Sequence, residues 1–215
     1  MDFISLDGRL SAFVVGDVAG CGVGPSVAAR SLQAFVRSSF LLGDRGRELL
    51  RRSDRFFARY VLGSDIAFAS LFVAILDVQD RTLMYASAGH ETALLYSGPN
   101  KHEHLPPTGP LIGLGLGSGA CGSFSDHTVP VDDQSILAIA TDGITDARSP
   151  VAPTAFFGSH GIVRAIASAR AEGADPARAV HAAAVSHGGG DLRDDASIVV
   201  ARWNLEPVGS RAVIG

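Results

Sequence analysis

The stretch 67–88, AFASLFVAILDVQDRTLMYASA, decides the fold class. Its two halves, 67–77 and 81–88, are both rich in β-branched, aromatic and other apolar residues, and only Val78-Gln79-Asp80 separates them. Two such runs joined by a short connection predict a β-hairpin. Because the strands of a hairpin pair antiparallel, the centre of the chain favours an antiparallel sheet over a regular βαβ alternation.

The sequence on both sides of this hairpin predicts further strands and paired helices. Strands are expected over 9–16, 92–96, 123–131, 135–141 and 196–203. Helical spacing predicts helices from Pro25 to about Phe40 and over 47–61, 161–171 and 176–187. Pro25 suits a first helical turn, and Asp175 is a plausible N-cap before Pro176. A turn at 97–100 and a loop over 105–119 complete the pattern, which predicts an α+β fold.

Composition narrows the class of protein. The 215 residues are 47% hydrophobic, enough for a buried core, and we expect one domain over 1–203 followed by a tail at 204–215. The net charge of −4 gives no reason to expect nucleic-acid binding. No apolar run is long enough to span a membrane, and the N-terminus does not resemble a signal peptide. With only Cys21 and Cys121, one disulfide is conceivable, but a reducing cytoplasm fits better.

Acidic residues recur where predicted strands meet turns. Asp17 follows a strand and opens a glycine-rich turn, Asp142 follows another strand and precedes Gly143, and Asp194-Asp195 precede the last strand. If these strands are neighbours, the carboxylates converge on one rim, which suits hard divalent cations that prefer oxygen ligands. The alternative is that each Asp only caps the backbone of its own turn. The residues alone leave both interpretations open.

Five short motifs occur in a fixed order along the chain. They are Gly16-Asp17-Val18-x-Gly-x-Gly, Phe68-Ala69-Ser70-Leu71-Phe72, Ala88-Gly89-His90, Thr141-Asp142-Gly143-Ile144-Thr145-Asp146-Ala147 and Asp194-Asp195-Ala196-Ser197. With these motifs the chain resembles the SpoIIE/RsbU branch of the protein phosphatase 2C (PPM) family, and the likeness runs from about residue 3 to residue 203.

The resemblance implies an αββα sandwich, in which two stacked antiparallel sheets are flanked by helices. It implies that Asp17 bridges two ions of Mg2+ or Mn2+, with the carbonyl of Val18 as a further ligand. Asp142 and Asp194 would bind the metal that Asp17 shares, while Asp195 and Gly143 rank second. Metal-activated water would attack phosphoserine or phosphothreonine directly, without a phosphoenzyme. The implied substrate is a phosphorylated protein, an anti-sigma-factor antagonist in a bacterial pathway.

One departure from the family pattern bears on activity. Relatives carry a Gly-Gly-Asp segment upstream of the first strand, and its Asp helps to bind one metal. Counting back from Asp17, Asp2 matches a later Asp of that stretch, and the ligand itself would fall before Met1. We expect either a sequence that begins late or a naturally short protein with weaker metal binding. The alternative function is therefore a catalytically impaired phosphatase fold that binds a signalling partner without turnover.

Several other patterns are weaker. His102 and His104 alternate as strand-borne metal ligands can, but surface loop histidines are the simpler interpretation. The glycines from Gly113 to Gly119 lack the Lys-Ser/Thr of a P-loop, which disfavours a nucleotide-binding enzyme. Cys21, where relatives have His or Lys, is expected to be packed. Arg51, Arg55 and Arg59 share one helix face, which is either solvated or docks an acidic partner or a regulatory domain.

Overall fold

The computed structural model describes residues 1–5, 8–61, 68–90, 92–98, 101–114, 123–152, 154–203 and 205. The chain divides into two compact units. The first comprises Met1–Glu91, Pro106–Val131 and Asn204–Gly215, and the second comprises Thr92–Leu105 and Asp132–Trp203. Parts of the predicted glycine loop, Cys121 and the tail beyond residue 205 lie outside the described residues.

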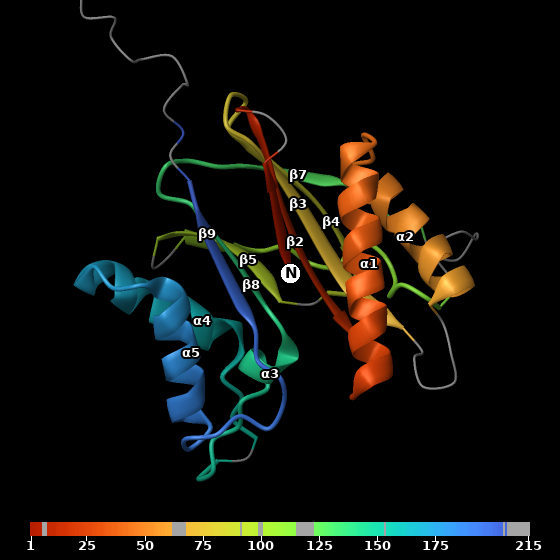
Figure 1. The fold of residues 1–215 in the computed structure, drawn as a ribbon. Helices are drawn as coiled ribbons and strands as arrows, with labels where there is room; N and C mark the ends of the chain where they lie inside the picture. Colours follow the sequence, from red (N-terminus) through yellow and green to blue (C-terminus); the bar gives the residue numbers. More distant parts are fainter. Residues whose placement is uncertain are drawn as a thin grey trace, which may run out of the picture. The chain divides into compact units, whose positions relative to one another are not determined.

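The first unit is built on an antiparallel sheet with the strand order β1-β2-β3-β4-β7 (Figure 1). Its strands are β1 (Asp2–Ser5), β2 (Leu10–Val18), β3 (Ala69–Asp77), β4 (Thr82–Ala88) and β7 (His127–Pro130). The predicted hairpin is confirmed, since β3 and β4 pair in register from Leu71↔Ala88 to Asp77↔Thr82. Asp77 closes its turn by accepting hydrogen bonds from the backbone N–H groups of Gln79 and Asp80, both at 3.0 Å.

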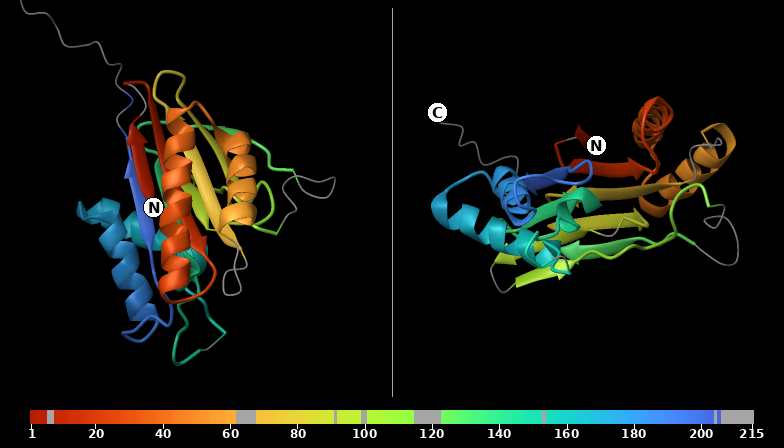
Figure 2. Two further views of the ribbon diagram at one scale, coloured as in Figure 1. Left: turned by 45° about the vertical axis from the view of Figure 1, so that its right-hand side comes forward. Right: turned by 90° about the horizontal axis from the view of Figure 1, so that it is seen from below.

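Two helices, α1 (Val23–Leu41) and α2 (Gly46–Tyr60), lie side by side against one face of this sheet (Figures 1 and 2). The alternation of strand side chains explains which face they cover, because Ala12, Val14 and Val18 of β2 point toward the helices. From α1 and α2 the same core receives a set of apolar side chains with helical spacing: Ala28, Leu32, Val36, Phe40, Leu49, Leu50 and Phe57. Pro25 lies in the first turn of α1, as predicted.

The second unit has its own antiparallel sheet, with the strand order β6-β5-β8-β9. The strands are β5 (Ala93–Gly98), β6 (Lys101–His104), β8 (Ile136–Ala140) and β9 (Ile198–Arg202). Its helices are α3 (Asp142–Thr145), α4 (Gly158–Glu172) and α5 (Pro176–His187), and α4 packs along α5. The predicted N-cap is confirmed, because Asp175 Oδ1 accepts from the backbone N–H groups of Ala177 and Arg178.

The α+β class, with two antiparallel sheets and flanking helices, is confirmed. Three short elements differ from the prediction. β1 and α3 were not expected, and the exposed β6 carries His102 and His104, for which a surface loop was the simpler expectation. His102 and His104 are therefore exposed residues of an edge strand, and the expectation of a loop was wrong. In the described part of the chain, no helix combines the length and apolar composition needed to cross a bilayer.

Candidate metal-binding acidic residues

Asp17 lies on β2, which continues two residues beyond its predicted end at Gly16. It is exposed and directly opposite Ser70 of β3. The expected glycine turn follows Val18, where Gly20 and Gly22 adopt positive φ values of 115° and 95°. Asp17 is thus held by a paired strand immediately before a turn that needs glycine.

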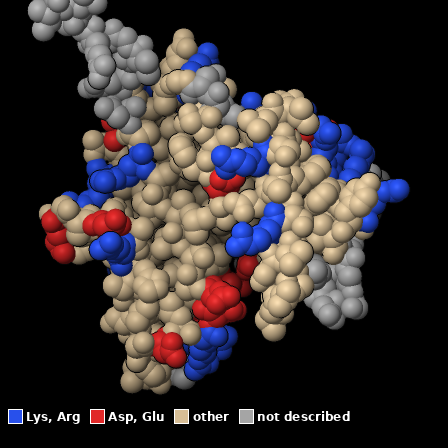
Figure 3. Space-filling view, in the orientation of Figure 1, with Lys and Arg blue, Asp and Glu red and all other residues tan. Residues whose placement is uncertain are grey.

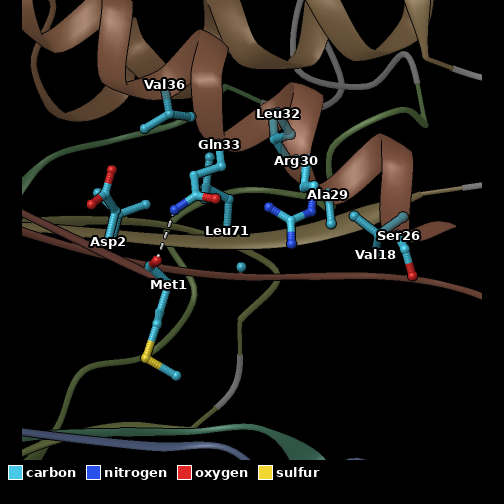
Figure 4. A pocket seen from close by; sticks show the side chains of 12 residues that line it. Met1, Asp2, Val18, Ser26, Ala29, Arg30, Leu32, Gln33, Val36 and Leu71 are labelled. Carbon is cyan, nitrogen blue, oxygen red and sulfur yellow. Dashed lines mark hydrogen bonds between the residues drawn. The ribbon is translucent and has the colours of Figure 1, made fainter.

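The opposite face of β2 carries a different feature, a cavity of about 360 Å³ beside α1 (Figure 4). Val14, Gly16 and Val18 line it from β2, and Arg30 and Gln33 project toward it from the helix. Because successive strand residues point to opposite faces, the Asp17 side chain lies on the other side of the strand from this cavity. The cavity is therefore separate from the surface that Asp17 presents.

Asp142 is the first residue of α3, directly after β8 and Thr141. Its side chain is exposed, and Oδ1 accepts a hydrogen bond from the Gly143 backbone N–H at 2.9 Å. Asp194 is also exposed, and its Oδ1 accepts from the Asp195 N–H at 2.8 Å. These are the local turn bonds that the capping interpretation predicts. Each bond engages one oxygen of a carboxylate that has two, so it is compatible with metal ligation.

Hydrogen bonds of Thr141 connect the Asp142 turn to the segment that follows Asp194. The Thr141 backbone N–H donates to the Ser197 carbonyl at 3.0 Å, and the Ser197 N–H donates to Thr141 Oγ1 at 2.9 Å. Thr141 Oγ1 also donates to the Asp195 carbonyl at 3.3 Å.

Gly143 completes this contact. A Cβ built at Gly143 would collide with the Asp195 carbonyl oxygen and lie 3.1 Å from the Ala196 Cα. Only glycine therefore permits the two acidic segments to approach this closely. The sequence places Gly143 and Thr141 in a motif, but their role depends on a partner more than fifty residues away.

The donor set has the chemistry of a hard-cation site: carboxylates and backbone carbonyls at the ends of strands. Asp142, Asp194 and Asp195 belong to the second unit, whereas Asp17 and Val18 belong to the first. Across the described residues, no three His, Cys, Asp or Glu side chains form a group that could hold a metal ion. The second unit thus brings together the segments that carry Asp142, Asp194 and Asp195, which are part of the predicted set.

Ser70 and His90 form a polar pair whose contact the sequence did not predict. Ser70 Oγ lies 3.0 Å from His90 Nδ1, and His90 is buried. Both residues occur in the quoted motifs, but a hydrogen bond between residues 20 positions apart leaves no signature in sequence spacing. The pair lies next to Asp17, because Ser70 is the cross-strand partner of Asp17.

The predicted arginine face lies on α2, and Figure 3 shows basic side chains gathered over this helix. Arg51 forms a bidentate ion pair with Glu48, and its hydrogen bond is the main cause that lowers the Glu48 pKa. Arg55 and Arg59 are exposed, and Arg59 lies over the Tyr60 ring. Cys21 is also exposed and forms no disulfide with a described residue, so the expectation that it is packed was wrong.

Comparison with known proteins identifies related sequences and folds. The family model for stage II sporulation protein E (SpoIIE) matches residues 7–204, nearly the whole chain. Protein IcfG of Synechocystis is 34% identical over 96 residues, which are 45% of this chain and 14% of IcfG. The chain therefore spans only a small part of this curated relative.

Solved structures share the fold. The RsbU and RsbW domains of Rv1364c from Mycobacterium tuberculosis match with a TM-score of 0.74 and 24% identity, covering 93% of this chain and 54% of that one. The PP2C phosphatase domain of Bacillus subtilis SpoIIE, with a regulatory fragment, matches with a TM-score of 0.77 and 14% identity, covering 94% and 57%. RsbX in complex with magnesium matches with a TM-score of 0.64 and 14% identity, covering 92% and 83%.

The family match, the motifs and the fold agree with one another. The sequence motifs that carry Asp17, Asp142 and Asp194 lie within the matched residues 7–204. The chain belongs to the SpoIIE family, and its fold is that of the PP2C phosphatase domain of SpoIIE.

Proposed function

We propose that this chain is a protein phosphatase that hydrolyses phosphoserine or phosphothreonine with the help of two bound Mg2+ or Mn2+ ions. The proposal is supported above all by the contact between the Asp142 turn and the Asp194-Asp195 segment, which consists of the Thr141 hydrogen bonds and the close approach at Gly143. A turn residue that serves only its own backbone does not require a second acidic segment to be held against it. The family is Mg2+/Mn2+-dependent, and the magnesium complex of RsbX supports this choice of cation.

The proposed ligands are the carboxylates of Asp17, Asp142 and Asp194 and the carbonyl of Val18. The metal ions would activate a water molecule and neutralise charge on the phosphoryl group. Asp142 and Asp194 would contribute rigidity, because their Oδ1 atoms are held by neighbouring N–H groups and leave Oδ2 oriented. Asp195 and Gly143 would act through the backbone contact that holds the two segments together.

The proposed substrate is a phosphorylated protein, specifically an anti-sigma-factor antagonist. The resemblance to the RsbU branch and the similarity to a chain that contains RsbU and RsbW domains support this choice. The chain covers 54% of that solved chain, so the partners of the relative are carried over here only as a proposal.

A phosphatase assay tests the proposal. The parent chain should hydrolyse para-nitrophenyl phosphate and a phosphoserine peptide with Mn2+ or Mg2+, and EDTA should abolish turnover. Asp142→Asn should lower turnover by about two orders of magnitude or more while the far-ultraviolet circular dichroism spectrum stays unchanged.

Asp191→Asn is a matched control. Asp191 is exposed in the same unit, and its Oδ1 also accepts from the next backbone N–H, that of Leu192 at 3.0 Å. Asparagine keeps an acceptor oxygen for the local turn bond in both variants, so a general effect of losing one surface carboxylate would appear in both, whereas loss of a metal ligand affects only Asp142→Asn. Equal turnover by Asp142→Asn and parent would refute the assignment. Peptide binding without turnover by the parent would instead favour the binding-module alternative.

A further inference from the structure

Three polar residues lie in a row across one end of the first unit's sheet. Asp17 is on β2, Ser70 is directly opposite on β3, and His90 follows the end of β4. Leu71 pairs with Ala88, so Ser70 faces the turn that carries His90. Asp17 and Ser70 point to the sheet face away from α1 and α2, because their neighbours Val18 and Leu71 belong to the core under those helices.

His90 is held firmly in this row. It is only 4% exposed, and its ring lies against Phe72 with 6.3 Å between the ring centroids. Its backbone carbonyl accepts from Ser87 Oγ at 3.0 Å. The preceding Gly89 has φ 64° and donates its N–H to the Gly109 carbonyl at 3.0 Å. The imidazole therefore has a fixed position from which Nδ1 reaches Ser70 Oγ at 3.0 Å.

The donor in this hydrogen bond decides what the Ser70 hydroxyl does. If the hydroxyl donates to Nδ1, it has no proton left for Asp17; if Nδ1–H donates, the hydroxyl proton can point to the carboxylate. Asp17 and Ser70 are directly opposed on one sheet face, where Cβ atoms lie about 4.5–5.5 Å apart, so rotation of either side chain brings the hydroxyl to the carboxylate. A bond to an ionised acceptor is roughly twice as strong as a neutral one, which favours the second arrangement.

We infer that His90 donates through Nδ1–H to Ser70, and that Ser70 donates its hydroxyl proton to the Asp17 carboxylate. Ser70 and His90 are then positioning residues for Asp17. The inference rests on the proposed function, which gives Asp17 the role of metal ligand. It adds two residues that act on the metal through the orientation of that ligand, as partners of ligating side chains commonly do.

The first test reads the tautomer without any metal. Long-range proton–nitrogen spectra of the ¹⁵N-histidine-labelled chain at pH 8 distinguish a protonated from an unprotonated Nδ1. The His90 signals are assigned by their loss in His90→Asn. We expect a proton on Nδ1 of His90. An unprotonated Nδ1 would overturn the inference, because the hydroxyl would then be the donor.

The second test measures Mn2+ binding through the electron paramagnetic resonance signal of free Mn2+. Ser70→Ala should weaken binding by about 10- to 100-fold, and Ser70→Thr, which keeps the hydroxyl, should bind like the parent. Ser31→Ala is the control, since the Ser31 hydroxyl donates only within α1, to the Val27 carbonyl at 2.9 Å. The Tm of metal-free Ser70→Ala is measured as well. A Tm close to that of the parent shows that the variant is folded, so that weaker Mn2+ binding reflects lost positioning of Asp17.

The outcomes separate the two proposals. Equal Mn2+ affinity of Ser70→Ala and parent would refute the positioning role, even if the parent is an active phosphatase. Absence of Mn2+-dependent turnover in the parent would refute the proposed function, while the tautomer spectrum would still decide the order of donors.

Discussion

Gly143→Ala probes the contact on which the proposed site depends. In the folded chain, a Cβ at this position would collide with the Asp195 carbonyl oxygen and lie 2.8 Å from the Asp195 carbonyl carbon and 3.1 Å from the Ala196 Cα. These are backbone atoms, which cannot rotate away as the end of a long side chain can. Gly143 lies in a helical turn, so alanine suits the local backbone and the effect arises from the contact alone.

The expected loss of stability follows from two terms. Overpacking a closed site costs about 1–3 kcal/mol. Separation of the segments would also weaken the bonds between Thr141 and Ser197, each worth about 0.5–1.5 kcal/mol. We expect Gly143→Ala to lower the free energy of unfolding by about 2–3 kcal/mol, which corresponds to a fall in Tm of roughly 4–12 °C for a chain of this size.

Trp203 provides the assay, because it is the single tryptophan of the chain and belongs to the second unit. Its indole N–H donates to the Asp132 carbonyl at 3.0 Å, so its fluorescence should follow urea unfolding of the unit that contains Gly143. Gly8→Ala is the control, since a Cβ at Gly8 meets no atom within 4 Å. If Gly143→Ala has the same free energy of unfolding as Gly8→Ala and the parent, the close approach of Gly143 to Asp195 is refuted.

Three further perturbations test other parts of the fold. Arg9 donates to both Asp77 carboxylate oxygens and lowers the Asp77 pKa below its usual 3.8. Because the folded pKa is depressed, this stabilisation is complete above pH 3.8 and is lost as the pH falls further. Asp77→Asn should therefore lower the unfolding free energy by about 0.5–1 kcal/mol at pH 7, and in urea titrations the gap should shrink below pH 3.8; a pH-independent gap would contradict this. Asp175→Ala should lower it by about 1 kcal/mol and Asp175→Asn by much less, since asparagine also caps helices; equal losses would argue against a capping role. Gly89→Ala should cost about 2 kcal/mol or more in thermal unfolding, because φ is positive and Leu111 occupies the Cβ position; an unchanged Tm would argue against this turn geometry.

The sequence predicted the elements that have strong local patterns. The apolar runs of β3 and β4, the helical spacing of α1 and α2 and the Asp175 cap of α5 are all local signals, and all are confirmed. The predicted bounds differ by a few residues because strand and helix ends depend on pairing and packing. β2, for example, extends to Val18 because Asp17 and Val18 pair with Ser70 and Ala69.

The missed elements lack such signals. β6 has the sequence Lys-His-Glu-His with every residue exposed, so it has no apolar periodicity and forms only by pairing with β5. α3 is a single turn of four residues, which is too short to be stable alone. It forms where the chain leaves β8, so its position depends on the tertiary fold and not on a local pattern.

The candidate site also depends on contacts that leave no local pattern in the sequence. Motifs drew attention to Asp142 and Asp194, but not to the long-range bonds of Thr141 or the close approach at Gly143 that hold their segments together.

The central claim, that Asp17, Asp142 and Asp194 are metal ligands, is tested most directly by a crystal structure of the parent chain grown with Mn2+, with the metal located by its anomalous scattering. We predict anomalous peaks within bonding distance of the carboxylates of Asp17, Asp142 and Asp194. Mn2+ peaks that contact none of these three carboxylates would contradict the account.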